Sequence, residues 1–277
     1  MSDYVYPTVL TIAGSDSGGG AGIQTDLKTF AALGCYGTSA VTAITVQNTL
    51  GVQSIHGIPA EILASQISVI LDDIRPYAIK IGMLYSQEQI ESVTAALIQY
   101  PDIPVILDPV MRSSAGQDLM SQATVNAMRE LLFPLVTLVT PNLDEASVLT
   151  NTAVTDEDQM QAAAQDLIHT GCYAVLVKGG HLKSNTLCNL YADRTGFTRK
   201  YFSNRIETKN THGTGCTLSS AIAAYLALGE RIELAVERAG LFVHNALLAG
   251  KDVKTGKGKG PLNHFFAPSP LVKRKLK

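Results

Sequence analysis

The chain has 277 residues and a mass of 29.5 kDa, long enough to bury a large core in one domain or two small ones. Its formal net charge of −2 gives no general attraction to nucleic acid, and no apolar run reaches the roughly 20 residues that cross a bilayer. We therefore expect neither nucleic acid nor a membrane as a partner. Four cysteines without paired spacing, and an N-terminus without a signal-peptide pattern, predict a cytoplasmic protein.

Strand-like and helix-like segments alternate along the chain. In chain order, the expected elements are a strand at 8–14, a helix at 22–34, a strand at 38–47, a helix at 59–74, a strand at 77–83, a helix at 86–100, a strand at 103–110, a helix at 121–132, a strand at 135–142, two helices within 142–170, a strand at 173–180, a hairpin or edge pair at 187–203, and a helix beginning near residue 213. Strands such as "VIL" and "AVLV" are continuously apolar, which is typical of a parallel sheet covered on both faces. We predict an α/β fold, a three-layer α/β/α sandwich with a mostly parallel sheet, as a single domain over 1–265 with a basic, flexible tail at 266–277.

Polar and glycine-rich segments follow most of the expected strands. They are "AGSDSGGGAG", "KIGML", "LDPVM", "TPNLDE", "VKGGH" and "THGTGCT". The carboxyl ends of parallel strands share one edge of a sheet, and open α/β sheets bind their ligands beyond that edge. The sequence therefore predicts a ligand site there.

Phosphate-binding motifs of the common kinds are missing. The segment "SGGGAG" fails the G-x-G-x-x-G spacing because Ile23 stands where the third glycine is needed, and no P-loop occurs. The helix that opens near Gly213 offers another device, because its first N–H groups lack partners and glycines allow an anion to come close. A thiol there, Cys216, is expected to have a lowered pKa. The alternative is a glycine-loosened helix cap with a buried cysteine.

These segments, with "ITVQNTLGVQSI" and "GKGPLNHF", resemble the hydroxymethylpyrimidine and phosphomethylpyrimidine kinases of thiamine biosynthesis, which belong to the ribokinase-like superfamily. The resemblance runs from about residue 8 to residue 265. It implies ATP-dependent phosphorylation of 4-amino-5-hydroxymethyl-2-methylpyrimidine to its monophosphate and then to the pyrophosphate. It also implies Mg²⁺ and ATP as cofactors and a homodimer.

The resemblance assigns roles to individual residues. The anion hole and catalytic group fall on Gly213, Thr214, Gly215 and Cys216, with the cysteine in place of the aspartate base of most of the superfamily. The pyrimidine contacts fall on Gly14, Asp26, Gln47, Met83 and Val110. The metal falls on Asp108 and Glu145, largely through water, and the nucleotide on Asn142 and Lys178. The amide of Gln47 can both donate to and accept from an aminopyrimidine edge, and Asp26 can accept from its amino group.

Each assignment has a plainer alternative. Gln47 can be a solvent-exposed strand end, Met83 a core residue and Asp26 a first-turn acid. Asn142 can be a helix cap, while Glu145 and Lys178 can be surface charges. His181 and His212 are interpreted as polar loop residues because neither has partners at metal-ligand spacing.

Two other functions stay open. Pyridoxal kinases with a similar loop carry a second cysteine after "DPVM", where this chain has Arg112, Ser113 and Ser114. This difference makes a pyridoxal kinase the less favoured interpretation. A non-catalytic nucleotide or pyrimidine sensor is the third possibility, and the intact "HGTGC" argues against it. The segment 112–119 is expected to be a flap over the substrate.

Overall fold

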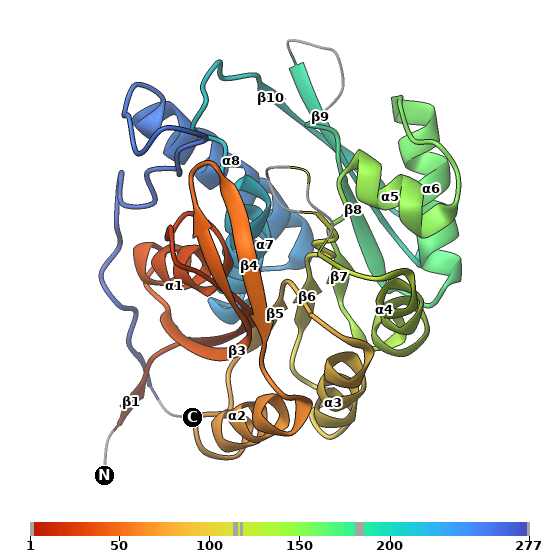
Figure 1. Cartoon of the computed structure of the whole chain (residues 1–277), viewed down its shortest axis with the longest axis vertical. Helices are drawn as coiled ribbons and strands as arrows, with labels where there is room; N and C mark the ends of the chain where they lie inside the picture. Colours follow the sequence, from red (N-terminus) through yellow and green to blue (C-terminus); the bar gives the residue numbers. More distant parts are fainter. Residues whose placement is uncertain (1–2, 113–115, 117–118, 181–185, 276–277) are drawn as a thin grey trace.

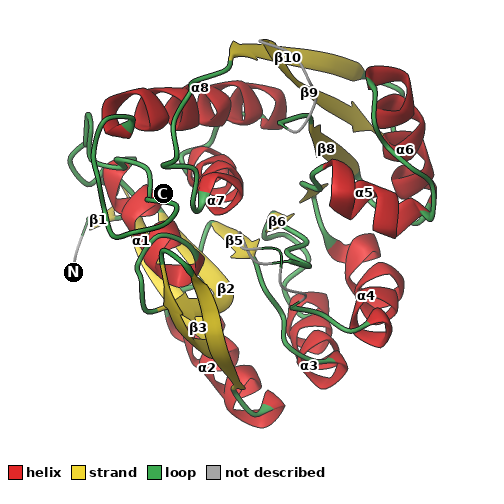
Figure 2. Ribbon diagram, turned by 45° about the horizontal axis from the view of Figure 1, so that its top comes forward, coloured by secondary structure: helices red, strands yellow, loops and turns green. Residues whose placement is uncertain are grey.

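The computed structural model describes residues 3–112, 116, 119–180 and 186–275. Most of the flap expected at 112–119, and His181, therefore lie outside the described residues. The described residues form a central sheet with helices on both faces (Figures 1 and 2). None of the helices in this part of the chain has the length and apolar character that crossing a bilayer requires.

The central sheet is mostly parallel. Its strand order is β10-β9-β8-β7-β6-β5-β2-β3-β4. The parallel strands are β2 (Thr8–Asp16), β3 (Tyr36–Asn48), β5 (Ala78–Ile81), β6 (Val105–Leu107), β7 (Leu138–Val139) and β8 (Ala174–Lys178). The antiparallel strands are β4 (Gly51–Gly57), β9 (Thr186–Asp193) and β10 (Thr198–Asn204). The three-layer α/β prediction is confirmed, and so is the hairpin expected at 187–203.

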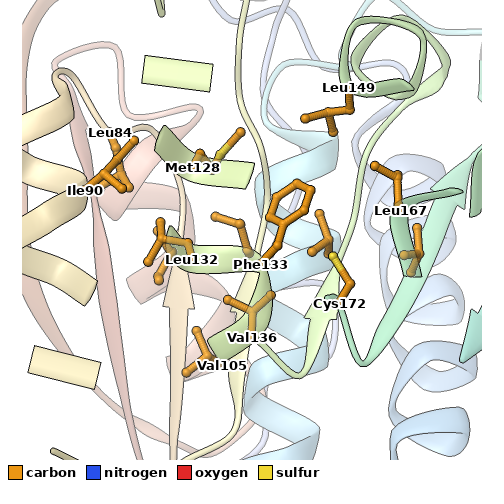
Figure 3. Close-up of a cluster of buried hydrophobic side chains, with 14 of the residues drawn as sticks. Leu84, Ile90, Val105, Met128, Leu132, Phe133, Val136, Leu149, Leu167 and Cys172 are labelled. Carbon is orange, nitrogen blue, oxygen red and sulfur yellow. The ribbon is translucent and has the colours of Figure 1, made fainter. Parts of the chain in front are cut away.

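Helices cover the two faces of the sheet in separate groups. One face is packed by α1 (Gly22–Ala32), α7 (Thr214–Ala227) and α8 (Ile232–Gly250). The other is packed by α2 (Ala60–Asp73), α3 (Gln87–Ile98), α4 (Gln122–Ala127), α5 (Leu143–Thr150) and α6 (Glu157–His169). Figure 3 shows part of the core on this second face, where Phe133 and Met128 lie among leucines and valines. Burying each side chain of this size contributes about 1.5–3 kcal/mol.

Local sequence signals set several helix boundaries. The Ser86 side chain accepts from the N–H of Gln89 and caps α3 at the expected place. Pro59 precedes α2 directly. The helix expected at 121–132 is different: α4 ends at Ala127 and the chain continues as a π-helical turn, Met128–Leu132, before a 3₁₀ turn that contains Pro134. The strand β4 and the helix α8 were not expected.

The described residues of the C-terminal segment lie against the domain. The N–H groups of Ser269 and Val272 donate to the carbonyls of Ala32 and Gly34. The strand β11 (Arg274–Lys275) pairs with β1 (Tyr4–Val5). These hydrogen bonds hold the segment beside the end of α1.

Candidate active site

The predicted site residues gather at the carboxyl edge of the parallel strands. Gln47 lies near the end of β3, Met83 follows β5, and Asp108 follows β6. Asn142 follows β7, and Lys178 ends β8. Helix α7 packs against β2, β5 and β6, so its N-terminus lies between the β3 side and the β8 side of this edge (Figure 2).

The first turn of α7 is built without a side-chain cap. Its N-cap is Gly213, with φ of +85°, no side chain caps the helix, and the first turn has no acidic residue. A Cβ on Gly213 would collide with the carbonyl oxygen of Gly20, so the glycine is required by both conformation and space. The N–H of Thr214 donates to the Thr211 carbonyl at 3.3 Å. First-turn N–H groups have no acceptor within the helix, and together with the positive end of the helix dipole they make this turn suited to an anion.

A buried ion cluster lies beside this turn. Lys178 Nζ is 2.7 Å from Asp108 Oδ1 and 3.8 Å from Glu145 Oε2. A Cβ on Gly215 would lie 3.2 Å from Lys178 Nζ and 3.5 Å from Asp108 Oδ2, so the helix backbone passes directly over the cluster. Ser219 of α7 donates to Asp108 Oδ2 at 3.4 Å. The structure therefore brings together the anion-hole, lysine and metal residues that the sequence assigned separately.

The two carboxylates of the cluster differ in their charge state. Burial opposes the charge of Asp108, but Lys178 and Lys80 hold its pKa below the usual value. Burial raises the pKa of Glu145 to about 7, although Lys178 partly offsets the rise. Glu145 also forms a capping box with Asn142: each side chain accepts from the other's backbone N–H, at 2.8 and 2.9 Å. The helix-capping interpretation of Asn142 is thus confirmed.

The carboxylates fit a magnesium ion that is held mainly by phosphate and water. Among the described residues, no three His, Cys, Asp or Glu side chains come together as a complete metal site. Asp108 and Glu145 nevertheless share Lys178 as a neighbour and lie beside the anion-binding turn. Mg²⁺ commonly takes one or two carboxylates together with substrate phosphates and waters, and this pair meets that requirement.

A second buried ion pair lies on the other side of α7, and its lysine was not predicted. Lys80 on β5 is fully buried, with Nζ 2.9 and 3.0 Å from the two oxygens of Asp26. The same carboxylate accepts from Thr11 and from Ser220 of α7, each at 2.6 Å. A lysine inside the apolar run "YAIKIGM" was the available signal, because buried lysines require a partner.

These contacts bear on the role of Asp26. Both of its oxygens already accept hydrogen bonds, and its side chain has no exposed surface. Direct contact with a substrate amino group stays a prediction, and it would require Asp26 to give up one of these partners. In the structure, Asp26 joins α1, β2, β5 and α7 at one carboxylate.

The expected lowered pKa of Cys216 is wrong. Burial raises the pKa of its thiol to about 11, and the opposing effects of Lys80 and of the N–H of Gly22 are smaller. Asp26 and Asp108 add to the rise. The helix start alone predicts a thiolate, but desolvation and two nearby carboxylates have the larger effect. The thiol is therefore neutral at pH 7 in the free protein.

The residues assigned to the pyrimidine lie on or just beyond β2, β3, β5 and β6, except Asp26, which lies on α1. A Cβ on Gly14 would lie 3.4 Å from the sulfur of Met83, so these two residues are neighbours. Gln47 is half-buried, with its side chain beside Thr45 and His212. Val110 is half-buried two residues beyond Asp108. His212 lies in the loop before α7, as interpreted, but it is buried there and contacts Asp16.

An uncapped helix N-terminus beside a lysine–carboxylate cluster, at the carboxyl edge of a parallel sheet, is the arrangement expected of an α/β phosphotransferase. A model of the family described as phosphomethylpyrimidine kinase matches residues 16–263. The chain belongs to this family, and it is a kinase.

Relatives support the same family. The hydroxymethylpyrimidine/phosphomethylpyrimidine kinase of Rhizobium meliloti is 47% identical over 92% of this chain and 96% of its own length. The thiamine biosynthesis bifunctional protein ThiED of Geobacter sulfurreducens is 46% identical over 96% of this chain, which spans 54% of that longer protein.

Solved structures show the same fold. A phosphomethylpyrimidine kinase from Clostridium difficile has a TM-score of 0.77 at 39% identity, covering 87% of this chain and 99% of its own. The pyridoxal kinase of Staphylococcus aureus in complex with AMP-PCP and pyridoxal has a TM-score of 0.85 at 33% identity, covering 94% of each chain. The ribokinase-like fold is therefore confirmed, and the second of these relatives binds an ATP analogue.

Proposed function

We propose that this kinase uses ATP to phosphorylate 4-amino-5-hydroxymethyl-2-methylpyrimidine, first to its monophosphate and then to the pyrophosphate, for thiamine biosynthesis. The observation that carries the proposal is the uncapped first turn of α7 between the Asp108–Lys178 pair and the Gln47 side of the sheet. Relatives named for this activity match nearly the whole chain.

The anion-binding turn would hold the transferring phosphoryl group. N–H groups of the Gly213–Cys216 turn would face the position where its charge develops, and preorganised donors of this kind lower the barrier most. Lys178 would contact the nucleotide phosphates, with Asn142 beside it on the same edge. Phosphoryl transfer depends mainly on such positioning and charge stabilisation.

Magnesium would be held by the triphosphate and, largely through water, by Asp108 and Glu145. It would neutralise the charge of the phosphates during transfer. Burial raises the pKa of Glu145, and a cation bound nearby would lower it again and favour the ionised carboxylate.

Cys216 would lie next to the hydroxymethyl group that attacks the phosphorus. Because its thiol is neutral in the free protein, it can act as a base only if bound substrate and nucleotide lower its pKa. In the pyrimidine site, the Gln47 amide would form hydrogen bonds with the amino group and ring nitrogen of the substrate. Gly14, Met83 and Val110 would contact the faces of the ring.

Pyridoxal kinase is the second candidate. The observation that favours it is the similarity to the Staphylococcus aureus enzyme, which covers 94% of this chain. Arg112 stands directly after "DPVM", in place of the aldehyde-trapping cysteine that the resemblance associates with pyridoxal.

A competition experiment separates the two candidates. The kcat/KM of the pyrimidine alcohol and of pyridoxal would be measured with magnesium-ATP. We expect the pyrimidine to be preferred by about 10²-fold or more, because only its amino edge matches Gln47. Equal values, or a preference for pyridoxal, would contradict the proposal.

We also propose a cytoplasmic homodimer. Ile44, Val46 and Leu50 on the β3–β4 hairpin expose 51%, 51% and 64% of their surface, which supports a self-association face. The cysteines at 35, 172, 188 and 216 are all free, which suits a reducing compartment. Light scattering that gives a monomer mass at micromolar concentration would contradict the dimer.

A further inference from the structure

The glycine-rich segment after β2 is occupied by a side chain of the protein itself. Asp16 Oδ1 accepts from the N–H of Gly18 at 2.8 Å. Its Oδ2 accepts from the N–H groups of Gly20 and Ala21 at 3.1 and 2.9 Å. Three backbone donors of the "SGGGAG" segment, those of Gly18, Gly20 and Ala21, are therefore committed to this carboxylate, while the N–H of Gly19 donates to the main-chain carbonyl of Asp16.

The same carboxylate binds a histidine from the anion-hole loop. His212 Nε2 lies 2.8 Å from Asp16 Oδ2, and the two side chains are 8% and 3% exposed. Burial opposes the charge of Asp16, but the bonds from His212, Gly18 and Ala21 lower its pKa, so the carboxylate is ionised at neutral pH. A carboxylate can only accept, so His212 Nε2 must carry a hydrogen.

That hydrogen decides how the amide of Gln47 is oriented. One end of the amide lies 3.2 Å from His212 Nε2, and the other lies 3.1 Å from Thr45 Oγ1. Thr45 has a single hydroxyl hydrogen, and the carbonyl of Ser15, 2.9 Å away, can only accept it. The one hydrogen on His212 Nε2 is directed at Asp16 Oδ2 at 2.8 Å, and the Gln47 amide, at 3.2 Å, can share it only as the weaker arm of a three-centre bond. A ring nitrogen that carries its hydrogen has no lone pair with which to accept from the Gln47 NH₂, whereas Thr45 does offer a lone pair.

Only one orientation of the amide satisfies both neighbours. The carbonyl oxygen of Gln47 must face His212, and its NH₂ must face Thr45. This is the amide turned by 180° about its last bond relative to the atom positions of the structure, in which Nε2 faces His212. Such a turn exchanges the nitrogen and oxygen positions without moving any neighbour.

The backbone of Gln47 is held as firmly as its side chain. Ser17 Oγ donates to the Gln47 carbonyl at 2.7 Å and accepts from its N–H at 2.9 Å. The main chain and the amide are therefore fixed by residues of the glycine-rich segment, of β3 and of the loop before α7. What stays available is one amide N–H and one carbonyl lone pair, in a fixed order.

We propose that the Asp16–His212 pair is a positioning device that locks the Gln47 amide in one orientation and so selects an amino over an oxo group on the substrate ring. The inference rests on the proposed function, in which Gln47 contacts the pyrimidine. A 4-aminopyrimidine offers an amino donor beside a ring-nitrogen acceptor, whereas its 4-oxo analogue offers the opposite order. A locked amide pairs with the first, and a freely turning amide can pair with either.

The test compares 4-amino-5-hydroxymethyl-2-methylpyrimidine with its 4-oxo analogue. The kcat/KM ratio of the two would be measured for the wild type, for His212→Phe, which removes the donor, and for His212→Gln, which can restore it. We expect the ratio to fall about tenfold or more in His212→Phe, because the KM for the amino substrate rises. The KM for ATP should stay within about twofold, and His212→Gln should recover much of the ratio.

Two further variants guard against a folding defect in His212→Phe. Thr45→Val removes the lone pair on the other side of the amide and should also lower the ratio. Thr38→Val is the matched control: it removes a buried hydroxyl from the same strand, one that bonds the Val9 carbonyl instead, and should leave the ratio unchanged. In a double-mutant cycle, adding His212→Phe to Gln47→Ala should lower the ratio no further.

Three results would overturn the inference. One is an unchanged ratio in both His212→Phe and Thr45→Val. Another is an equal loss on both pyrimidines together with a raised KM for ATP, which would mean that His212 only supports the Gly213 turn. A wild type that discriminates poorly between the two pyrimidines would also overturn it. A wild type that does not phosphorylate the amino substrate at all would refute the proposed function itself.

Discussion

Substitution of Gly215 tests the anion-binding turn directly. A Cβ here would lie 3.2 Å from Lys178 Nζ and 3.5 Å from Asp108 Oδ2. The two side chains form an ion pair, with Lys178 Nζ 2.7 Å from Asp108 Oδ1. Valine would place two further methyl groups in the same space, force Lys178 away and cover the N–H groups of the turn. Loss of one preorganised donor costs on the order of 10²–10³ in rate, or about 2.7–4 kcal/mol.

The measurement is kcat and KM for ATP of Gly215→Val and Gly215→Ala, with thermal unfolding as the check on folding. We expect Gly215→Val to lose about 10²–10³ in kcat, and Gly215→Ala to lose less, because the flexible end of Lys178 can yield to one methyl group. Gly240→Ala is the matched control: that helical glycine on α8 has no heavy atom within 4 Å of an added Cβ. A fully active, folded Gly215→Val protein would refute the reasoning.

Four further predictions concern the buried titratable groups. Cys216→Ala should lower kcat by about 10²–10⁴-fold if the thiol becomes the base in the complex, and a fully active variant would leave Cys216 only a packing role. Iodoacetamide labelling of the free protein should show a thiol pKa well above 8.5. Glu145→Gln should raise the magnesium concentration needed for half-maximal rate, and an unchanged requirement would contradict the metal assignment. Burial raises the pKa of Glu145 from 4.5 to about 7, so the protonated carboxyl stabilises the fold fully below pH 4.5 and this contribution is lost as the pH rises through 7. The Tm of Glu145→Gln should therefore rise relative to that of the wild type between pH 5 and 8. A Tm difference that stays constant over this range would contradict the prediction. Lys80→Met should lower the free energy of unfolding in urea by about 3–5 kcal/mol, because it leaves the Asp26 carboxylate without its buried cation. Adding Asp26→Asn should recover part of this loss. A loss below about 1 kcal/mol would show that the ion pair is not structural.

The sequence predicted the edge of the sheet at which the site lies. Continuous apolar strands indicate a parallel sheet, and in such a sheet every strand ends at the same edge. Asp108 and Lys178 were therefore placed at one edge, although they are 70 residues apart in the chain. The capping signals of Ser86 and of Asn142 with Glu145 were also readable, because they depend on spacings of three residues.

The sequence could not predict the buried partners within the site. Asp16 and His212 are 196 residues apart, and Lys80 and Asp26 are 54 apart, so no local pattern connects them. The pKa of Cys216 was predicted in the wrong direction because a helix start is visible in the sequence, whereas the burial that outweighs it depends on packing. Strand β4 was missed because Gly51 and the polar residues after it do not resemble a buried strand.

One measurement tests the central claim most directly. The protein would be incubated with magnesium-ATP and 4-amino-5-hydroxymethyl-2-methylpyrimidine, and the products would be followed over time by mass spectrometry. The proposed function predicts a product heavier by one phosphoryl group, followed by one heavier by two, both dependent on ATP. Absence of either product, from a folded protein that phosphorylates pyridoxal under the same conditions, would contradict it.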